Sequence, residues 1–109
     1  MTTFDDRERA FEKKYAHDAE MQFKASARRN RLLGLWAAEI LGKTGDDADA
    51  YAKEVVIADL KSAGDDDVHG KVLADLEAGG SPIDGPTLRK RMNALMAEAK
   101  AQIASETKD

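Results

Sequence analysis

The segment from Phe23 to Gly42 changes character at its midpoint, and this change constrains the fold more than any other feature of the chain. The first half carries four basic side chains: Lys24, Arg28, Arg29 and Arg31. The second half is apolar on nearly every side of a helix, with Leu32, Leu33, Leu35, Trp36, Ile40 and Leu41. A helix that is apolar all round is buried all round. We therefore expect the second half at the centre of a small core, with Trp36 in its middle, and the basic first half outside that core.

The composition favours one small all-helical domain. Its 109 residues suit a single domain, only two of them are proline, and no stretch alternates as a strand does. The absence of cysteine excludes disulfides and thiolate chemistry. The N-terminus is charged from residue 5, and the longest apolar run, Leu32 to Leu41, is too short to span a membrane and contains Glu39. We expect a cytoplasmic protein that does not insert into the membrane and is monomeric when free.

Capping and breaking residues divide the chain into four predicted helices, at about 19–42, 45–62, 66–78 and 85–104. Gly42 ends the first and Gly64 the second. The run Gly79–Pro82 is the clearest break, and Pro86 marks the first turn of the last helix. Short loops between four helices predict an all-α bundle over residues 19–105, followed by a frayed tail at 106–109.

Residues 1–18 differ from the rest because their apolar content is thin. Phe4, Phe11 and Tyr15 form one narrow stripe, at i, i+7 and i+11, among charges of both signs. Such a stripe is too narrow to pack a helix, and a helix this short is marginal in water. One interpretation is a frayed extension of the next helix. The other is a projecting arm, partly disordered or marginally helical, that binds a partner through Phe11 and Tyr15.

The charge of the chain is divided unevenly. Residues 1–31 carry eight Lys/Arg and six Asp/Glu, whereas residues 32–109 carry nine and fifteen. The acidic body argues against broad binding of nucleic acid. The Arg28–Arg31 cluster is more typical of a solvated helix face than of a phosphate-binding site. A small helical nucleic-acid-binding regulator that uses this cluster remains the alternative hypothesis.

Three other motifs fail on inspection. Gly42-Lys43-Thr44 ends like a phosphate-binding loop, but Ala37 stands where that loop needs glycine, and a helix precedes it instead of a strand. A nucleotide sensor or enzyme built on it is a weak third hypothesis. The Asp65–Gly70 run imitates a calcium loop but has Leu76 at its twelfth position. His17 and His69 lie far apart without cysteines to complete a zinc site. We therefore predict no catalytic residue, no cofactor and no metal.

Three segments carry a resemblance to a known family. Phe4–Asp18, Phe23–Gly42 and Ala50–Val56 resemble the zeta subunit of alphaproteobacterial F-type ATP synthases, and the acidic run Asp65–Asp67 is similar to the acidic loop of that family. The similarity extends from about Phe4 to Ile103 and is densest before residue 60.

The resemblance implies a four-helix protein, not an enzyme, that inhibits ATP hydrolysis by the catalytic head of the synthase. In that family the N-terminal segment inserts between catalytic and non-catalytic subunits, near the rotor, and blocks rotation in the hydrolytic direction. The implied location is cytoplasmic, attached peripherally to the inner membrane through the synthase. Carried onto this chain, the partner-binding set is Phe4, Asp5, Asp6, Arg7, Glu8, Arg9, Phe11, Glu12, Lys13, Lys14, Tyr15 and His17. From charge alone we add Arg28, Arg29 and Arg31 as a secondary contact.

Overall fold

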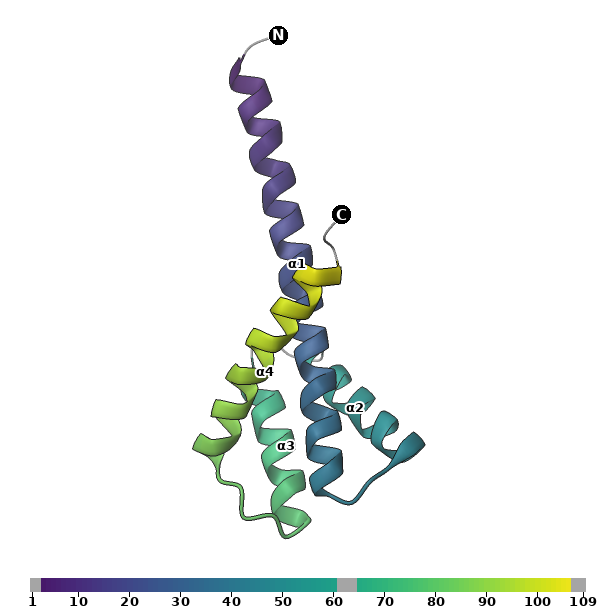
Figure 1. Ribbon diagram of the computed structural model, residues 1–109. Helices are drawn as coiled ribbons and strands as arrows, with labels where there is room; N and C mark the ends of the chain where they lie inside the picture. The colour runs from purple at the N-terminus through teal and green to yellow at the C-terminus, as the bar shows by residue number, and fades with distance from the viewer. Residues whose placement is uncertain (1–2, 61–64, 107–109) are drawn as a thin grey trace.

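One long helix, α1, runs through the whole molecule in the computed structural model (Figure 1). The structure describes the backbone of residues 3–60 and 65–106, and the side chains of residues 18–60 and 65–106. The described residues form α1 (Thr3–Ile40), α2 (Gly45–Leu60), α3 (Asp66–Ala78) and α4 (Gly85–Glu106). The predicted all-α bundle of four helices is confirmed.

The N-terminal part of α1 extends beyond the other three helices (Figure 1). A helix of 38 residues is about 57 Å long at 1.5 Å per residue, and the molecule measures 64 Å along its longest axis against 27 and 22 Å across. The predicted arm and the predicted first helix are therefore one continuous helix, with no break in the backbone near Asp18. We use the name body for the part of the molecule in which α2, α3 and α4 pack on α1.

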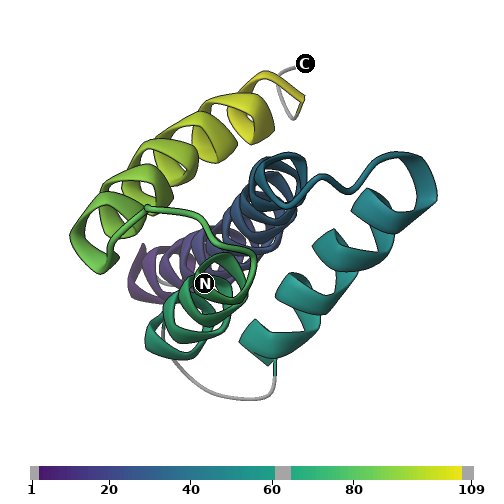
Figure 2. The ribbon, with the colours of Figure 1, turned by 90° about the horizontal axis from the view of Figure 1, so that it is seen from below.

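Within the body, α1 lies between α2 and α4, and all three other helices pack against it. Seen along its axis, α2 and α4 lie on opposite sides of α1 and α3 lies between them (Figure 2). Each of the three contacts α1, and α3 also contacts α2 and α4. The position of each helix in the bundle thus depends on its contact with α1.

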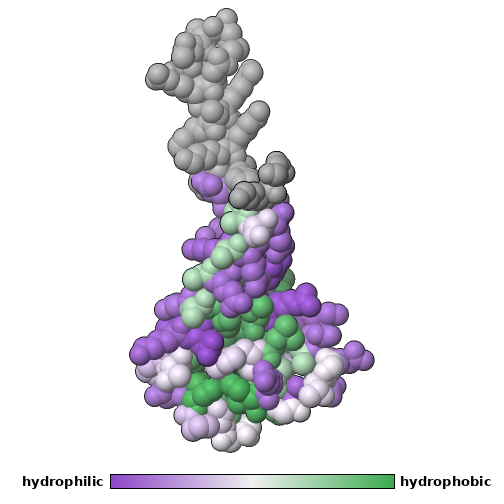
Figure 3. All heavy atoms as spheres, in the orientation of Figure 1, coloured by the Kyte–Doolittle hydropathy of each residue, from purple (hydrophilic) through white to green (hydrophobic). Residues whose placement is uncertain are grey.

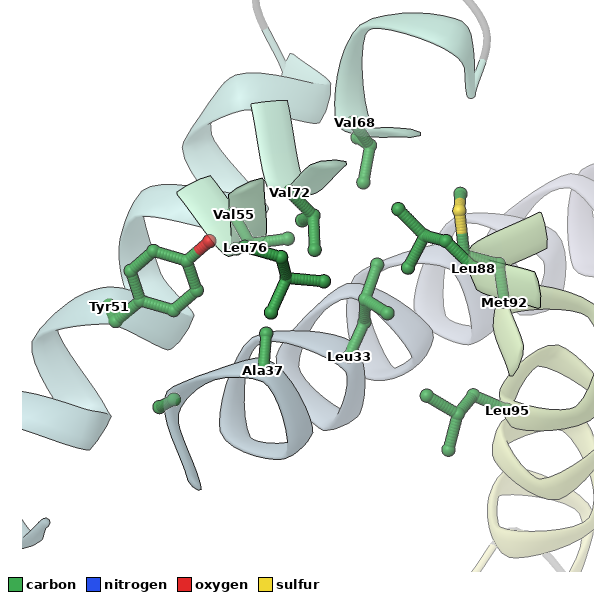
Figure 4. Close-up of a cluster of buried hydrophobic side chains, with 11 residues drawn as sticks. Leu33, Ala37, Tyr51, Val55, Val68, Val72, Leu76, Leu88, Met92 and Leu95 are labelled. Atoms are coloured by element: carbon green, nitrogen blue, oxygen red, sulfur yellow. The ribbon is translucent and has the colours of Figure 1, made fainter. Parts of the chain in front are cut away.

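All four helices contribute to one apolar core (Figure 4). Its most deeply buried members include Leu33 of α1, Val55 of α2, Leu76 of α3 and Leu88 of α4, each with no exposed surface. The other buried members are Ala37, Ala38, Tyr51, Val68, Val72, Met92 and Leu95. Helices α2, α3 and α4 supply most of this set.

Trp36 does not occupy the centre of the core, so that expectation is wrong. It is partly buried against the core, and its ring lies 5.3 Å from the guanidinium of Arg91. Ile40 is 40% exposed, so the second half of the segment is not buried on every side. Apolar atoms accordingly reach the surface of the body between hydrophilic ones (Figure 3).

Small residues explain why the largest side chain lies at the border of the core. The buried residues in this half of α1 are mostly small. They are Gly34, Ala37 and Ala38, and the remaining one is Leu33. Small side chains allow neighbouring helices to approach α1 closely, and bulky side chains then lie where two helices meet at the surface.

Local signals placed the ends of the helices well. Gly42 has φ of +78°, and the amide of Lys43 donates to the carbonyl of Ala38 at 2.8 Å, which forms the predicted glycine cap after α1. The third helix has its predicted bounds, and α4 extends two residues past its predicted end. The predicted end of the second helix at residue 62, the stop at Gly64 and residues 107–109 of the predicted tail lie outside the described residues. The predicted tail began at Glu106, which is instead the last residue of α4.

Gly34 marks the closest approach between α1 and α2. A Cβ atom added to Gly34 would lie 2.6 Å from the Cα of Ala52 and 3.1 Å from its Cβ. The first of these atoms is backbone, so it cannot move aside unless α2 shifts as a whole. Gly70 in α3 offers the opposite case, because a Cβ atom there would meet nothing within 4 Å.

We predict that Gly34→Ala lowers the free energy of unfolding by about 1–3 kcal/mol, because the added methyl group overpacks the contact between α1 and α2. Gly70→Ala is the matched control and should raise stability by about 0.5–1 kcal/mol, since alanine suits an open helical position better than glycine. Urea unfolding followed by circular dichroism measures both. A stabilising Gly34→Ala would contradict the close contact.

Candidate partner-binding surface

The predicted partner-binding arm lies on the projecting part of α1. Residues 3–17 are helical in backbone, whereas the side chains of Phe4 to His17 lie outside the described side chains. The arm set therefore stays a prediction, residue by residue. Among the described side chains of α1, the first buried one is Ala25, at 2% exposure. Phe23, at the start of the half that we expected outside the core, is 62% exposed.

Arg28 connects α1 to the end of α4. Its guanidinium donates to both carboxylate oxygens of Glu106, at 2.6 and 2.7 Å, and to the side-chain oxygen of Gln102 at 2.8 Å. The hydrogen bond from Arg28 holds the pKa of Glu106 below its ordinary value. This bidentate contact fixes α4 beside α1 near the point where the arm leaves the body.

Arg29 is a buried residue of the bundle, with only 2% of its surface exposed. It donates to Asp65, just before α3, at 2.7 and 3.4 Å, and to the side-chain oxygen of Asn30 at 2.7 Å. The hydrogen bond from Arg29 lowers the pKa of Asp65 in the folded protein. A buried guanidinium is stable only with such partners, so this contact joins α1 to the start of α3.

The proposed basic contact surface is therefore not a cluster. The expectation that the basic half of this segment lies outside the core is wrong for Arg29, which faces the bundle interior. Arg28 forms an ion pair with Glu106 of the same chain. Arg31 is exposed, and no ion-pair partner for it lies in the described part of the chain.

Of the residues in the remaining sequence motifs, His69 and Gly42-Lys43-Thr44 lie among the described side chains, whereas His17 does not. The ring Nε2–H of His69 donates to the carbonyl of Gly85 at 2.8 Å, and this hydrogen bond links α3 to the start of α4. Gly42-Lys43-Thr44 lies in the exposed loop after α1. No group of three potential metal ligands occurs among the described residues. In the same residues, no helix is both long and apolar enough to cross a membrane.

A second polar contact escaped sequence reasoning. The hydroxyl of Tyr51 in α2 donates to Asp75 in α3 at 2.8 Å, and Lys71 approaches the same carboxylate at 3.1 Å. Burial, followed by the hydrogen bond to Asp75, raises the pKa of Tyr51. Nothing in the local sequence pairs these residues, because Tyr51 and Asp75 are 24 positions apart.

Comparison with known proteins agrees with this architecture. The family described as ATPase inhibitor subunit zeta matches residues 1–102. A structure solved by solution NMR is 55% identical, with a TM-score of 0.69, over 79% of this chain and 98% of that chain. The comparison with curated proteins found no match.

The body is small and helical, and one helix projects from it. The family match covers nearly all of that body and the whole arm. This chain belongs to the ATPase inhibitor subunit zeta family, as the resemblance in its sequence indicated. Its role is that of an ATPase inhibitor. Such a role is more consistent with a regulatory protein than with an enzyme.

We predict that Asp65→Asn lowers stability near neutral pH by about 1–2 kcal/mol, because the buried Arg29 loses its charged partner while water compensates in part. The pKa of Asp65 is lowered in the folded state, so its contribution is present above its ordinary value of 3.8 and is lost as pH falls through the folded value. The gap between wild type and variant should therefore close in acid.

Urea unfolding at neutral pH and at about pH 3 tests this expectation. Asp66→Asn is the control, since Asp66 is 96% exposed and forms only a surface pair with Arg89. Its effect should be much smaller. Equal effects of the two substitutions, or a gap for Asp65→Asn that does not change with pH, would contradict the role of Arg29 and Asp65.

Proposed function

We propose that this protein inhibits ATP hydrolysis by the catalytic head of the F-type ATP synthase and performs no chemistry itself. The N-terminal arm of α1 inserts at an interface between catalytic and non-catalytic subunits, near the rotor. Insertion there blocks rotation in the hydrolytic direction. The protein is then held at the inner membrane only indirectly, through the synthase.

The observation that carries this proposal is the extent of the family match, which includes every residue of the arm and nearly all of the body. The geometry supports it. The arm and the core share one helix, so the body presents the arm as an extended rod instead of a loose tail. A segment that is already helical has less conformational entropy to lose when it binds.

The arm sequence suits such a contact. In a helix, positions 4, 11 and 15 share one face, so Phe4, Phe11 and Tyr15 would be buried together against the partner. Aromatic anchors of this kind supply most of the binding energy at protein interfaces. The charged arm residues around them, Asp5, Asp6, Arg7, Glu8, Arg9, Glu12, Lys13, Lys14 and His17, would set register and specificity.

The alternative of nucleic-acid binding loses support. It depended on the Arg28–Arg31 cluster, yet Arg28 and Arg29 form ion pairs inside the molecule. One exposed arginine on an acidic body does not make a phosphate-binding stripe.

We predict that deleting residues 2–17 abolishes inhibition of ATP hydrolysis by the isolated catalytic head, because the arm is the inserting element. The body should stay folded, since the buried side chains described in α1 begin at Ala25. ATP hydrolysis and thermal unfolding of the truncated chain measure the two outcomes separately. Full inhibition by the truncated chain would contradict the proposal.

Replacing both aromatic anchors provides a finer test. Phe11→Ala with Tyr15→Ala should weaken inhibition at least tenfold with little change in melting temperature, because the proposal assigns these rings to the contact with the partner. Ile40→Ala is the control, since Ile40 is an exposed apolar residue at the opposite end of α1. If Ile40→Ala lost as much inhibition, the assignment of Phe11 and Tyr15 as partner-binding anchors would be wrong.

A further inference from the structure

An apolar groove follows the junction of α1 and α2 and reaches the end of α4. It consists of two adjoining depressions, with cavity volumes of about 510 and 350 Å³, that share Arg31 and Val56. The apolar side chains that line the groove are Phe23, Ala27, Ala52, Val56, Ile57 and Ile103. We call this surface the α1–α2 groove.

Large apolar side chains are exposed at this groove in a way that packing does not explain. Phe23 is 62% exposed and Ile57 is 50% exposed, and both line it. Leu60, three residues after Ile57 on α2, is 64% exposed. The described chain has only one other large apolar side chain of comparable exposure, Ile40, near the end of α1. Clustered exposure of this kind marks an interaction surface, whereas scattered exposure does not.

The rim of the groove is basic, although the body as a whole is acidic. Arg31 and Lys53 line it, and neither has an ion-pair partner in the part of the chain that the structure describes. Lys24 is paired with the exposed Glu20 at 3.2 Å, and Arg28 is paired with Glu106. Asp49 is the remaining acid of the lining. A partner surface that combines apolar and acidic side chains would complement this pattern.

The groove begins close to the base of the arm. Phe23 is six residues beyond His17 on the same helix, which corresponds to about 9 Å along its axis. A protein that holds the arm is therefore within reach of the groove. Because both sites lie on one rigid helix, the second contact forms at a high effective concentration once the first has formed.

We propose that the α1–α2 groove is a second docking site, which binds a surface of the same synthase head that carries both acidic and apolar side chains. This inference rests on the proposed function. The groove strengthens binding of the inhibitor and the arm performs the block. It replaces the secondary contact that we first assigned to Arg28, Arg29 and Arg31: only Arg31 remains, and Lys53, Phe23 and Ile57 join it.

Charge reversal tests the rim. In the full chain, Arg31→Glu with Lys53→Glu should weaken binding to the isolated catalytic head about tenfold at low salt, and less at high salt, because a rim charge acts mainly through steering. Lys43→Glu with Lys90→Glu is the matched control, with the same change in net charge at exposed positions outside the groove. Fluorescence anisotropy of labelled protein measures binding, and ATP hydrolysis is followed in parallel.

Polar substitution tests the exposed apolar side chains of the groove. Phe23→Ser with Ile57→Ser should speed dissociation at least tenfold and leave the melting temperature unchanged, because both side chains are exposed in the free protein. Ile40→Ser is the control for losing an exposed apolar side chain elsewhere. Light scattering of each variant records its oligomeric state.

The outcomes separate the two proposals. Weaker binding by both groove variants, with controls unchanged, supports the groove. Inhibition by wild type, with groove variants equal to their controls, overturns the groove and leaves the proposed function intact. Binding of wild type without inhibition overturns the proposed function, while sensitivity to the groove variants would still support the groove. Wild type that does not bind the head overturns both. A dimer that the groove variants dissociate makes the groove a contact between copies and overturns this assignment.

Discussion

The contact of three helices with a single central one is the constraint on which this structure depends. α2, α3 and α4 all pack on α1, and the core extends from Leu33 and Ala37 toward each of them. Close packing requires small residues on α1, so Gly34 approaches the backbone of Ala52 and Trp36 is left at the border. Because the same helix continues as the arm, the packing of the body also fixes the direction in which the arm projects.

Two neighbouring arginines hold that central helix to the ends of its neighbours. Arg28 reaches Glu106 at the end of α4, and Arg29 reaches Asp65 at the start of α3. The two contacts differ in kind, since Arg28 is partly exposed whereas Arg29 is buried and depends on its partner. Together they brace α1 close to the base of the arm. Two of the arginines that appear as a basic surface in sequence thus form contacts within the chain. Of the basic residues that line the α1–α2 groove, Arg31 and Lys53 have no ion-pair partner among the described residues.

Sequence reasoning succeeded where the signal was local. The glycine cap at Gly42 and the bounds of α3 both follow from residues a few positions apart, and the family resemblance came from long contiguous segments. It failed where the outcome depended on distant residues. The partner of Arg29 is 36 positions away and that of Arg28 is 78 away, so no local pattern distinguishes a buried arginine from a solvated one. For the same reason Trp36 appeared central, because its own neighbours do not reveal which side of α1 the other helices cover. The residues of the arm that contact the partner remain a prediction from resemblance.

The central proposal is that the projecting end of α1 enters the catalytic head while the far end of the body stays outside. The chain has no cysteine, so a single introduced one carries a photo-crosslinker at a unique place. Ala10→Cys on the arm and Ile40→Cys at the other end of α1 form a matched pair. The account predicts that the probe at position 10 crosslinks to catalytic and non-catalytic subunits of the head and locks ATP hydrolysis, whereas the probe at position 40 does neither. Crosslinking from position 40 with none from position 10 would contradict it.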